Sequence, residues 1–142
     1  MIKNLLIVLI VIIPSLNIAQ KLSGYQWHNR LLVISNPLNN LEKETEQLEL
    51  LGSLDQDFKE RKILVLKLTN HNYTVLNSNV TTNTSDPIGI EGLTLSEKEF
   101  SILLIGLDGG IKLRQNQSIK RDELFAIIDG MPIRQSELRQ KN

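Results

Sequence analysis

The chain contains no cysteine, so any chemistry it performs would rest on other side chains. A thiolate is required for disulfide exchange, for cysteine-ligated zinc and for iron–sulfur clusters. The composition therefore excludes thiol redox chemistry, disulfide bonds and every metal site that needs a cysteine ligand.

Two histidines, His28 and His71, are present. A transition-metal site without cysteine would need both of them together with carboxylates, and their separation forms no metal-binding motif. The spacing favours two unconnected surface histidines and predicts no cofactor, while calcium or magnesium binding by converging acids stays open. A triad of Ser35, His28 and Asp108 can be written, but no nucleophile elbow or oxyanion motif accompanies it.

Cationic and aromatic residues give the sharpest hypothesis for a site. They could line a pocket for a carboxylate or a phosphate, because guanidinium and ammonium groups both recognise anions. The candidate ligand or partner contacts are Trp27, Arg30, Lys112, Arg114 and Arg134. The competing interpretation, which we favour, is that arginines pair with acids and hold the last helix against the sheet. These pairs would join Arg30, Arg61 and Arg134 to Glu60, Asp129 or Glu137.

Carboxylates offer a second kind of chemistry. An enzyme without a cofactor could use Asp108, Asp129 or Glu60 as its acid or base. Such an enzyme needs a concave pocket in which a carboxylate is buried beside an arginine or lysine, whereas a flat surface favours a binding role. The sequence Asp108-Gly109-Gly110 lies between two expected strands and therefore indicates a tight turn rather than a phosphate loop.

Residues 1–19 are typical of an export signal. They combine the basic Lys3, a nine-residue apolar run and a polar stretch that ends in Ala19. The run is shorter than the roughly 18 to 20 residues of a membrane span, so we expect cleavage before Gln20 and no stable membrane insertion afterwards. Retention of the segment as an N-terminal anchor is the alternative. The remainder, residues 20–142, has the length of one domain.

The charge of the chain is balanced, with 16 basic and 16 acidic residues. A balanced surface gives no general attraction to nucleic acid or to anionic membranes. We therefore expect a protein or a small molecule as the partner.

The pattern of apolar residues predicts an α/β domain. Buried strands are expected at 31–34, 63–68 and 100–105, and a half-exposed strand at 111–114 after the hairpin turn. Helices are expected from Asn36 to Gly52 with Leu38 and Leu41 on the apolar face, around Leu54 and Phe58, and from Ser118 to Pro132. Asn, Thr and Ser dominate residues 70–86, which indicates a long surface connection with a short edge strand at 73–76.

The sequences LLIGLDGGIKLR (103–114) and LFAIIDGMPIR (124–134) carry a resemblance to a known family. Together with Trp27 and Phe58, they make the chain similar to the bacterial family of domain of unknown function 4174. Leu107, Lys62 and Ile133 depart from the residues usual in that family. The resemblance implies a thioredoxin-like fold, as a two-layer or three-layer α/β sandwich with a mixed four-stranded sheet, and it brings no known activity.

The resemblance also implies an exported protein of the bacterial periplasm or exterior. Redox members of the thioredoxin-like fold carry cysteine where the first strand leads into the first helix, and this chain has Ser35-Asn36-Pro37 there. The characteristic cis-proline is missing too. We therefore expect a binding or accessory module of the bacterial envelope rather than an enzyme, with a cofactor-independent carboxylate enzyme as the alternative and a purely structural role through oligomerisation as a third possibility.

Overall fold

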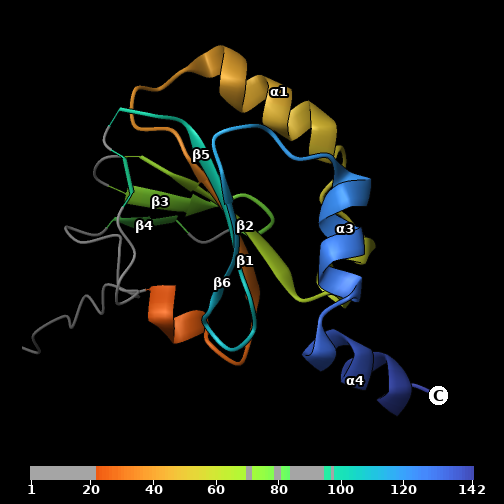
Figure 1. Ribbon diagram of the computed structural model, residues 1–142. Helices are drawn as coiled ribbons and strands as arrows, with labels where there is room; N and C mark the ends of the chain where they lie inside the picture. The colour runs from red at the N-terminus through yellow and green to blue at the C-terminus, as the bar shows by residue number, and fades with distance from the viewer. Residues whose placement is uncertain (1–21, 70–71, 79–80, 84–94, 97) are drawn as a thin grey trace, which may run out of the picture.

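The computed structural model describes residues 22–69, 72–78, 81–83, 95–96 and 98–142 (Figure 1). These residues form a mixed α/β structure with one six-stranded sheet in the order β4-β3-β2-β1-β5-β6. The strands are β1 (Arg30–Ser35), β2 (Ile63–Leu68), β3 (Asn72–Val75), β4 (Thr81–Asn83), β5 (Ser101–Ile105) and β6 (Ile111–Gln115). The helices are the 3-10 helix η1 (Leu22–Tyr25), α1 (Leu41–Leu51), α2 (Gln56–Glu60), α3 (Arg121–Asp129) and α4 (Pro132–Gln140).

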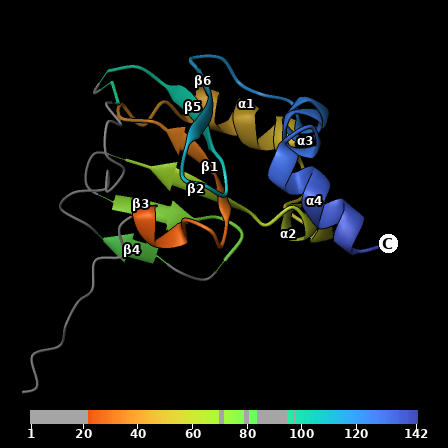
Figure 2. The same ribbon diagram turned by 60° about the horizontal axis from the view of Figure 1, so that its bottom comes forward.

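Strand β1 lies inside the sheet, between β2 and β5, and all six of its residues are buried. It runs parallel to β2, with α1 in the connection between them, and antiparallel to β5. The segment from β1 to β2 is a parallel βαβ unit, and the β5–β6 hairpin predicted from the sequence is confirmed. Figure 2 shows the strands stepping from β6 at one edge of the sheet to β4 at the other.

Alternating residues of β1 supply both faces of the sheet. Leu32 and Ile34 pack with apolar residues of α1, α2 and α3, which form the larger cluster. Leu31 and Val33 point to the opposite face and pack with residues of β2, β3 and β5. Figures 1 and 2 show α1 and α3 on the same side of the sheet, so these helices and the sheet form two layers.

The first helix is capped by Asn40 rather than Asn36, so it begins four residues later than the sequence indicated. The side chain of Asn36 accepts a hydrogen bond from Asn40 N and donates to Asn40 O, which holds residues 36–40 in a turn. Asn40 then caps α1 by accepting from Lys43 N at 3.1 Å. The prediction that Leu38 and Leu41 face the core was therefore wrong, and both side chains are exposed.

The sheet is larger than the four strands expected. The polar stretch after β2 contributes β3, which pairs with β2, and β4, which pairs with β3. The predicted strand at 73–76 exists as β3, but β4 rather than β3 lies at the sheet edge. Tyr73 and Val75 of β3 are buried, so alternation within this short segment was enough to build a strand.

The chain changes direction between α3 and α4. The expected helix begins at Arg121 rather than Ser118, and it ends at Asp129, three residues before Pro132, where the sequence placed its end. Pro132 then occupies the first turn of α4, where a proline costs no hydrogen bond. No helix among the described residues is long and apolar enough to span a membrane. The predicted export signal lies outside the described residues.

Candidate functional site

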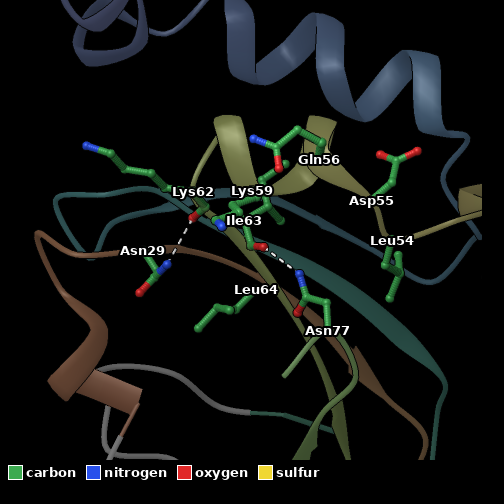
Figure 3. Close-up of a pocket in the computed structure, with 9 residues that line it drawn as sticks. All are labelled: Asn29, Leu54, Asp55, Gln56, Lys59, Lys62, Ile63, Leu64 and Asn77. Carbon is green, nitrogen blue, oxygen red and sulfur yellow. Dashed lines mark hydrogen bonds between the residues drawn. The ribbon is translucent and has the colours of Figure 1, made fainter. Parts of the chain in front are cut away.

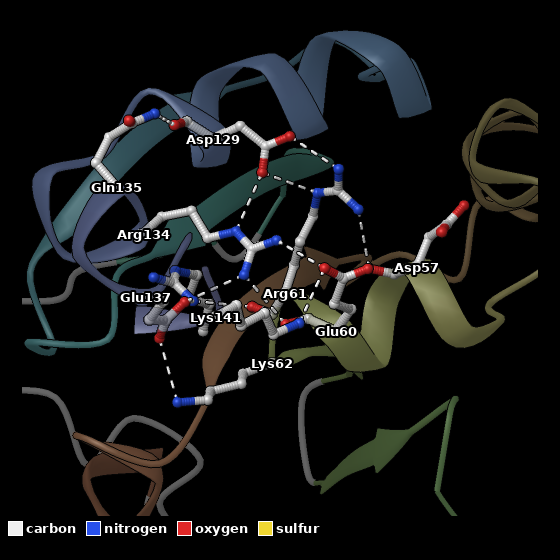
Figure 4. Close-up of polar contacts among 10 residues, drawn as sticks. Asp57, Glu60, Arg61, Lys62, Asp129, Arg134, Gln135, Glu137 and Lys141 are labelled. Carbon is white, nitrogen blue, oxygen red and sulfur yellow. Dashed lines mark hydrogen bonds and ion pairs between the residues drawn. The ribbon is translucent and has the colours of Figure 1, made fainter. Parts of the chain in front are cut away.

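Arg134, in the first turn of α4, is the centre of an ionic network (Figure 4). Its side chain is almost completely buried, and Nε lies 3.2 Å from Oδ1 of Asp129. Its Nη atoms lie 3.4 Å from Oε1 of Glu60 and 3.4 Å from Oε2 of Glu137. Arg61 contacts Oδ2 of Asp129 at 2.8 Å. The ion pairs expected from the sequence are confirmed, and they join α4 to α2 and to the end of α3.

The carboxylates of this network stay ionised. Burial alone would raise the pKa of the Asp129 carboxyl, but hydrogen bonds from Arg61 and Arg134 bring it below its usual value. Burial likewise acts to raise the pKa of Glu137, but Lys62, Arg30 and Arg134 together bring it below its usual value. A carboxyl that is deprotonated at neutral pH cannot serve as a general acid there. The network therefore stabilises the fold rather than supplying acid catalysis.

Arg30 begins β1 and is completely buried. Its Nη1 atom donates to the backbone oxygen of Arg61 at 2.9 Å and to Oε2 of Glu137 at 3.3 Å. Among the described residues, no group accepts a hydrogen bond from its Nε or Nη2. Leaving buried donors without acceptors costs about 1–3 kcal/mol for each group, and more where the group is charged. Arg30 therefore has one edge fixed by the protein and one edge that lacks an acceptor.

A cavity of about 240 Å³ lies beside Arg30. It is formed between the β5–β6 turn and the junction of α3 with α4, which Figure 1 shows at the same end of the molecule. The lining residues are Arg30, Leu107, Asp108, Lys112, Met131, Pro132 and Ile133. We call this space the Arg30 cavity. Four of its seven lining side chains are apolar, which is typical of small-molecule sites with a few polar groups.

The β5–β6 turn positions the polar side chains of the Arg30 cavity. Gly109 adopts a φ of +82°, which glycine tolerates better than other residues, and Gly106 N donates to Gly110 O at 2.8 Å. Asp108 accepts from Gly110 N at 3.0 Å and pairs with Nζ of Lys112 at 3.0 Å. The backbone bond from Gly110 and the ammonium of Lys112 lower the pKa of the Asp108 carboxyl. The turn therefore presents an ionised carboxylate and a lysine together.

A second cavity, of about 430 Å³, lies next to α2 and β2 (Figure 3). Its lining residues are Asn29, Leu54, Asp55, Gln56, Lys59, Lys62, Ile63, Leu64 and Asn77. The amide of Asn77 is used by the backbone of β2, since it accepts from Val65 N and donates to Ile63 O. None of the buried polar atoms that lack a partner in the described part of the chain belongs to this cavity. The larger cavity therefore offers a weaker case for a ligand.

The structure separates the five sequence-predicted contact residues. Arg30 and Lys112 line the same cavity, and Arg134 lies next to Arg30 through their shared partner Glu137. Arg114 instead lines a different cavity, of about 170 Å³, with Glu99 and Asn116. Trp27 is 62% exposed, and its backbone N–H donates to Leu107 O. The described cavities therefore do not bring all five residues together.

Sequence reasoning missed the apolar wall of the Arg30 cavity. The sequence named Leu107 and Ile133 only as departures from the family and Pro132 only as the end of a helix, and none of them was expected to line a site. Pro132 was the available signal, because a helix break beside a hairpin turn leaves side chains of both segments facing one another.

The catalytic triad considered from the sequence is not assembled. Ser35 ends β1, whereas Asp108 follows β5 beside the opposite end of β1, about 15 Å away by strand length. His28 is exposed, and His71 lies outside the described residues. The described residues contain no group of three His, Asp or Glu side chains that could hold a metal ion.

The fold and the cavity define a cysteine-free mixed α/β protein with a buried arginine at the end of its central strand. The family model described as Domain of unknown function (DUF4174) matches residues 21–137, and the chain belongs to this family. The resemblance seen in the sequence is therefore confirmed at the level of the family. No curated protein matches the sequence.

Proposed function

We propose that the protein is an exported binding module of the bacterial envelope, which captures a small anionic ligand in the Arg30 cavity. One observation carries this proposal. Arg30 lines a cavity, and one edge of its guanidinium is buried without a hydrogen-bond acceptor. A bound anion would supply the missing acceptor and would also balance a buried positive charge.

The apolar wall of the cavity supports a small molecule as the ligand. Leu107, Met131 and Ile133 could bury an organic group, whereas a broad protein interface would need a much larger contact area. The volume of about 240 Å³ is smaller than that of drug-sized sites, which supports a ligand of metabolite size.

We further propose a thioredoxin-like core for this module. The strand order β2-β1-β5-β6, with β1 parallel to β2 and antiparallel to β5, supports that assignment. Redox members would use the end of β1 at Ser35, where this chain offers a hydroxyl instead of a thiolate. The Arg30 cavity lies at the other end of β1, so its use would be independent of the redox position.

Binding accounts for the cavity better than acid–base catalysis. The cavity does place Asp108 beside Arg30 and Lys112, as a carboxylate enzyme would require. The side chain of Asp108 is 37% exposed, however, and the lowered pKa makes this carboxylate a weak base and excludes it as an acid at neutral pH.

The proposal is tested by thermal unfolding of the purified protein with a panel of small carboxylates, phosphates, neutral alcohols and amines. A ligand that binds the native state stabilises it by about 2.7 kcal/mol at a concentration of 100 times its Kd. We expect stabilisation by anions alone, and we expect Arg30→Lys to remove it because lysine lacks the planar pair of donors. Arg114→Ala is the matched control, since Arg114 lines another cavity. Stabilisation that persists in Arg30→Lys would contradict the proposal.

A further inference from the structure

We propose that the Arg30 cavity selects a monocarboxylate with a short apolar body, and that Asp108 and Lys112 at the cavity set the preference for a single negative charge. This inference rests on the proposed function and names the chemical class of the ligand. It follows from the shape of the free guanidinium edge, the lining of the cavity and the local charge.

The free edge of Arg30 matches the geometry of a carboxylate. Nε and Nη2 lie on the same side of the planar guanidinium and can donate two parallel hydrogen bonds to two oxygens in one plane. Nη1 is already used by Arg61 O and Glu137, so it is not available for a third oxygen. A phosphate would therefore keep at least one oxygen without a donor from Arg30.

The remaining lining favours an apolar body behind the carboxylate. Leu107, Met131, Pro132 and Ile133 have no side-chain hydrogen-bond donor for further oxygens. A volume of 240 Å³ corresponds to about eight water-sized volumes of roughly 30 Å³ each. The ligand that fills the space is thus an acid of about eight non-hydrogen atoms.

The charge of the lining suits one negative charge. Arg30 and Lys112 are positive and Asp108 is negative, which leaves a net charge of plus one among the side chains that line the cavity. The pKa of the Asp108 carboxyl is lowered, so its charge persists at neutral pH. The second negative charge of a dianion would have to pair with Lys112, and there it would be repelled by the Asp108 carboxylate.

Access to Arg30 requires a side chain to move. The Nε and Nη2 atoms are covered from solvent, so a carboxylate reaches them only when a flexible neighbour turns aside. Lys112 and Met131 are the unbranched side chains of the lining, and both can change rotamer at low cost. The Lys112 stem lies against Gly106, where any Cβ would collide with it, so its present position depends on that glycine.

The experiment is isothermal titration calorimetry on the purified protein near pH 7 with hexanoate, hexyl phosphate and hexan-1-ol. The three probes share one apolar chain and differ in head group, and hexyl phosphate carries a charge of about −1.5 to −2 there. We expect hexanoate to bind about tenfold more tightly than hexyl phosphate and hexan-1-ol, which equals about 1.4 kcal/mol. Arg30-dependent binding in which hexyl phosphate equals or exceeds hexanoate would overturn the carboxylate preference and leave the anion site standing. Absence of Arg30-dependent binding by any probe would overturn the proposed function as well.

Variants separate the cavity from a general effect on folding. Ile133→Trp fills the cavity without changing Arg30, and it should abolish binding of hexanoate while the protein stays folded by circular dichroism. Asp108→Asn keeps the side-chain oxygen that caps the turn but removes its charge, so the preference of hexanoate over hexyl phosphate should fall about threefold. Wild-type affinity for hexanoate in Ile133→Trp, or an unchanged preference in Asp108→Asn, would overturn the assignment.

A carboxylate with an apolar neighbour could come from a free acid or from the C-terminus of a peptide. N-acetylleucine separates these sources, because it carries the amide group of a peptide beside its carboxylate. The apolar lining lacks side-chain partners for that amide, so hexanoate should bind more tightly than N-acetylleucine. Tighter binding of N-acetylleucine would overturn the free acid in favour of a peptide C-terminus.

Discussion

Replacement of Arg134 by methionine should destabilise the protein by about 2–3 kcal/mol, because breaking a buried ion pair by removing one partner costs roughly 3–5 kcal/mol. The expected loss lies at or below the lower end of that general range because of the partners of Arg134. Asp129 and Glu60 are 35% and 38% exposed and can recruit water, and Asp129 keeps its bond to Arg61. Methionine retains most of the buried aliphatic stem, so the loss reports on the guanidinium.

The assay is urea unfolding followed by far-ultraviolet circular dichroism, with thermal unfolding as a second measurement. For a domain of this size the expected loss corresponds to a fall in Tm of about 6–15 °C. Arg134→Lys keeps the charge but loses the planar set of guanidinium donors, so its stability should lie between those of the wild type and Arg134→Met. A Tm for Arg134→Met within about 2 °C of the wild type would refute the structural role of the network.

The pH dependence gives this prediction a second test. The pKa values of Asp129 and Glu137 are lowered in the folded protein, so their contribution is present above the unfolded values of about 4 and is lost as the pH falls through the folded values. The stability difference between wild type and Arg134→Met should therefore shrink as the pH is lowered from about 5 towards 3. A difference that stays constant over this range would show that the carboxylates are not its source.

Two further predictions concern hydrogen bonds to the backbone. Gln47→Leu should cost about 2–4 kcal/mol in urea unfolding, because buried Gln47 donates to Ile119 O and accepts from Ile119 N at 2.9 and 2.8 Å; a loss below about 1 kcal/mol would contradict it. Asn40→Ala should cost about 1 kcal/mol through loss of the α1 cap, and an unchanged urea midpoint would show that another group caps the helix.

The core of the fold could be predicted because its signals are local. The run from Ile63 to Leu68 is apolar with one polar interruption, which indicates a strand. Asp108-Gly109 is a turn sequence that connects two antiparallel strands. Such signals depend on the alternation of side chains and on the conformations that glycine allows. They identified β1, β2, β5 and β6 with nearly correct bounds.

The errors arose where distant or competing hydrogen bonds decide the structure. Asn36 can cap a helix, but here its amide holds the backbone of Asn40 and delays α1. The β4 strand was not predicted, because all three of its residues are polar, and it forms where β3 offers a free edge for pairing. Neither the contact of Asn36 with Asn40 nor the pairing of β4 with β3 can be identified from the local sequence.

The candidate site was predictable in part for the same reason. Arg30 and Lys112 were named from their chemistry, yet only the register of β1 with β5 brings the start of β1 close to the β5–β6 turn. Arg114 lies two residues beyond Lys112 on β6, and this step of about 7 Å carries it to a different cavity. Residue type suggested the contacts, and strand register decided which of them meet.

The sequence offered two alternative roles for Arg30, as a structural arginine or as a ligand contact, and one side chain can serve both. A guanidinium has five donors fixed in one plane, so one edge can hold Arg61 O and Glu137 while the other edge is buried without an acceptor. The structural contacts fix the direction of the free edge before any ligand arrives, which reduces the entropy lost on binding. Lysine could not take both roles, because its single ammonium has no second edge of defined direction. The contacts that stabilise the fold are therefore the same contacts that would make the Arg30 cavity a preorganised site.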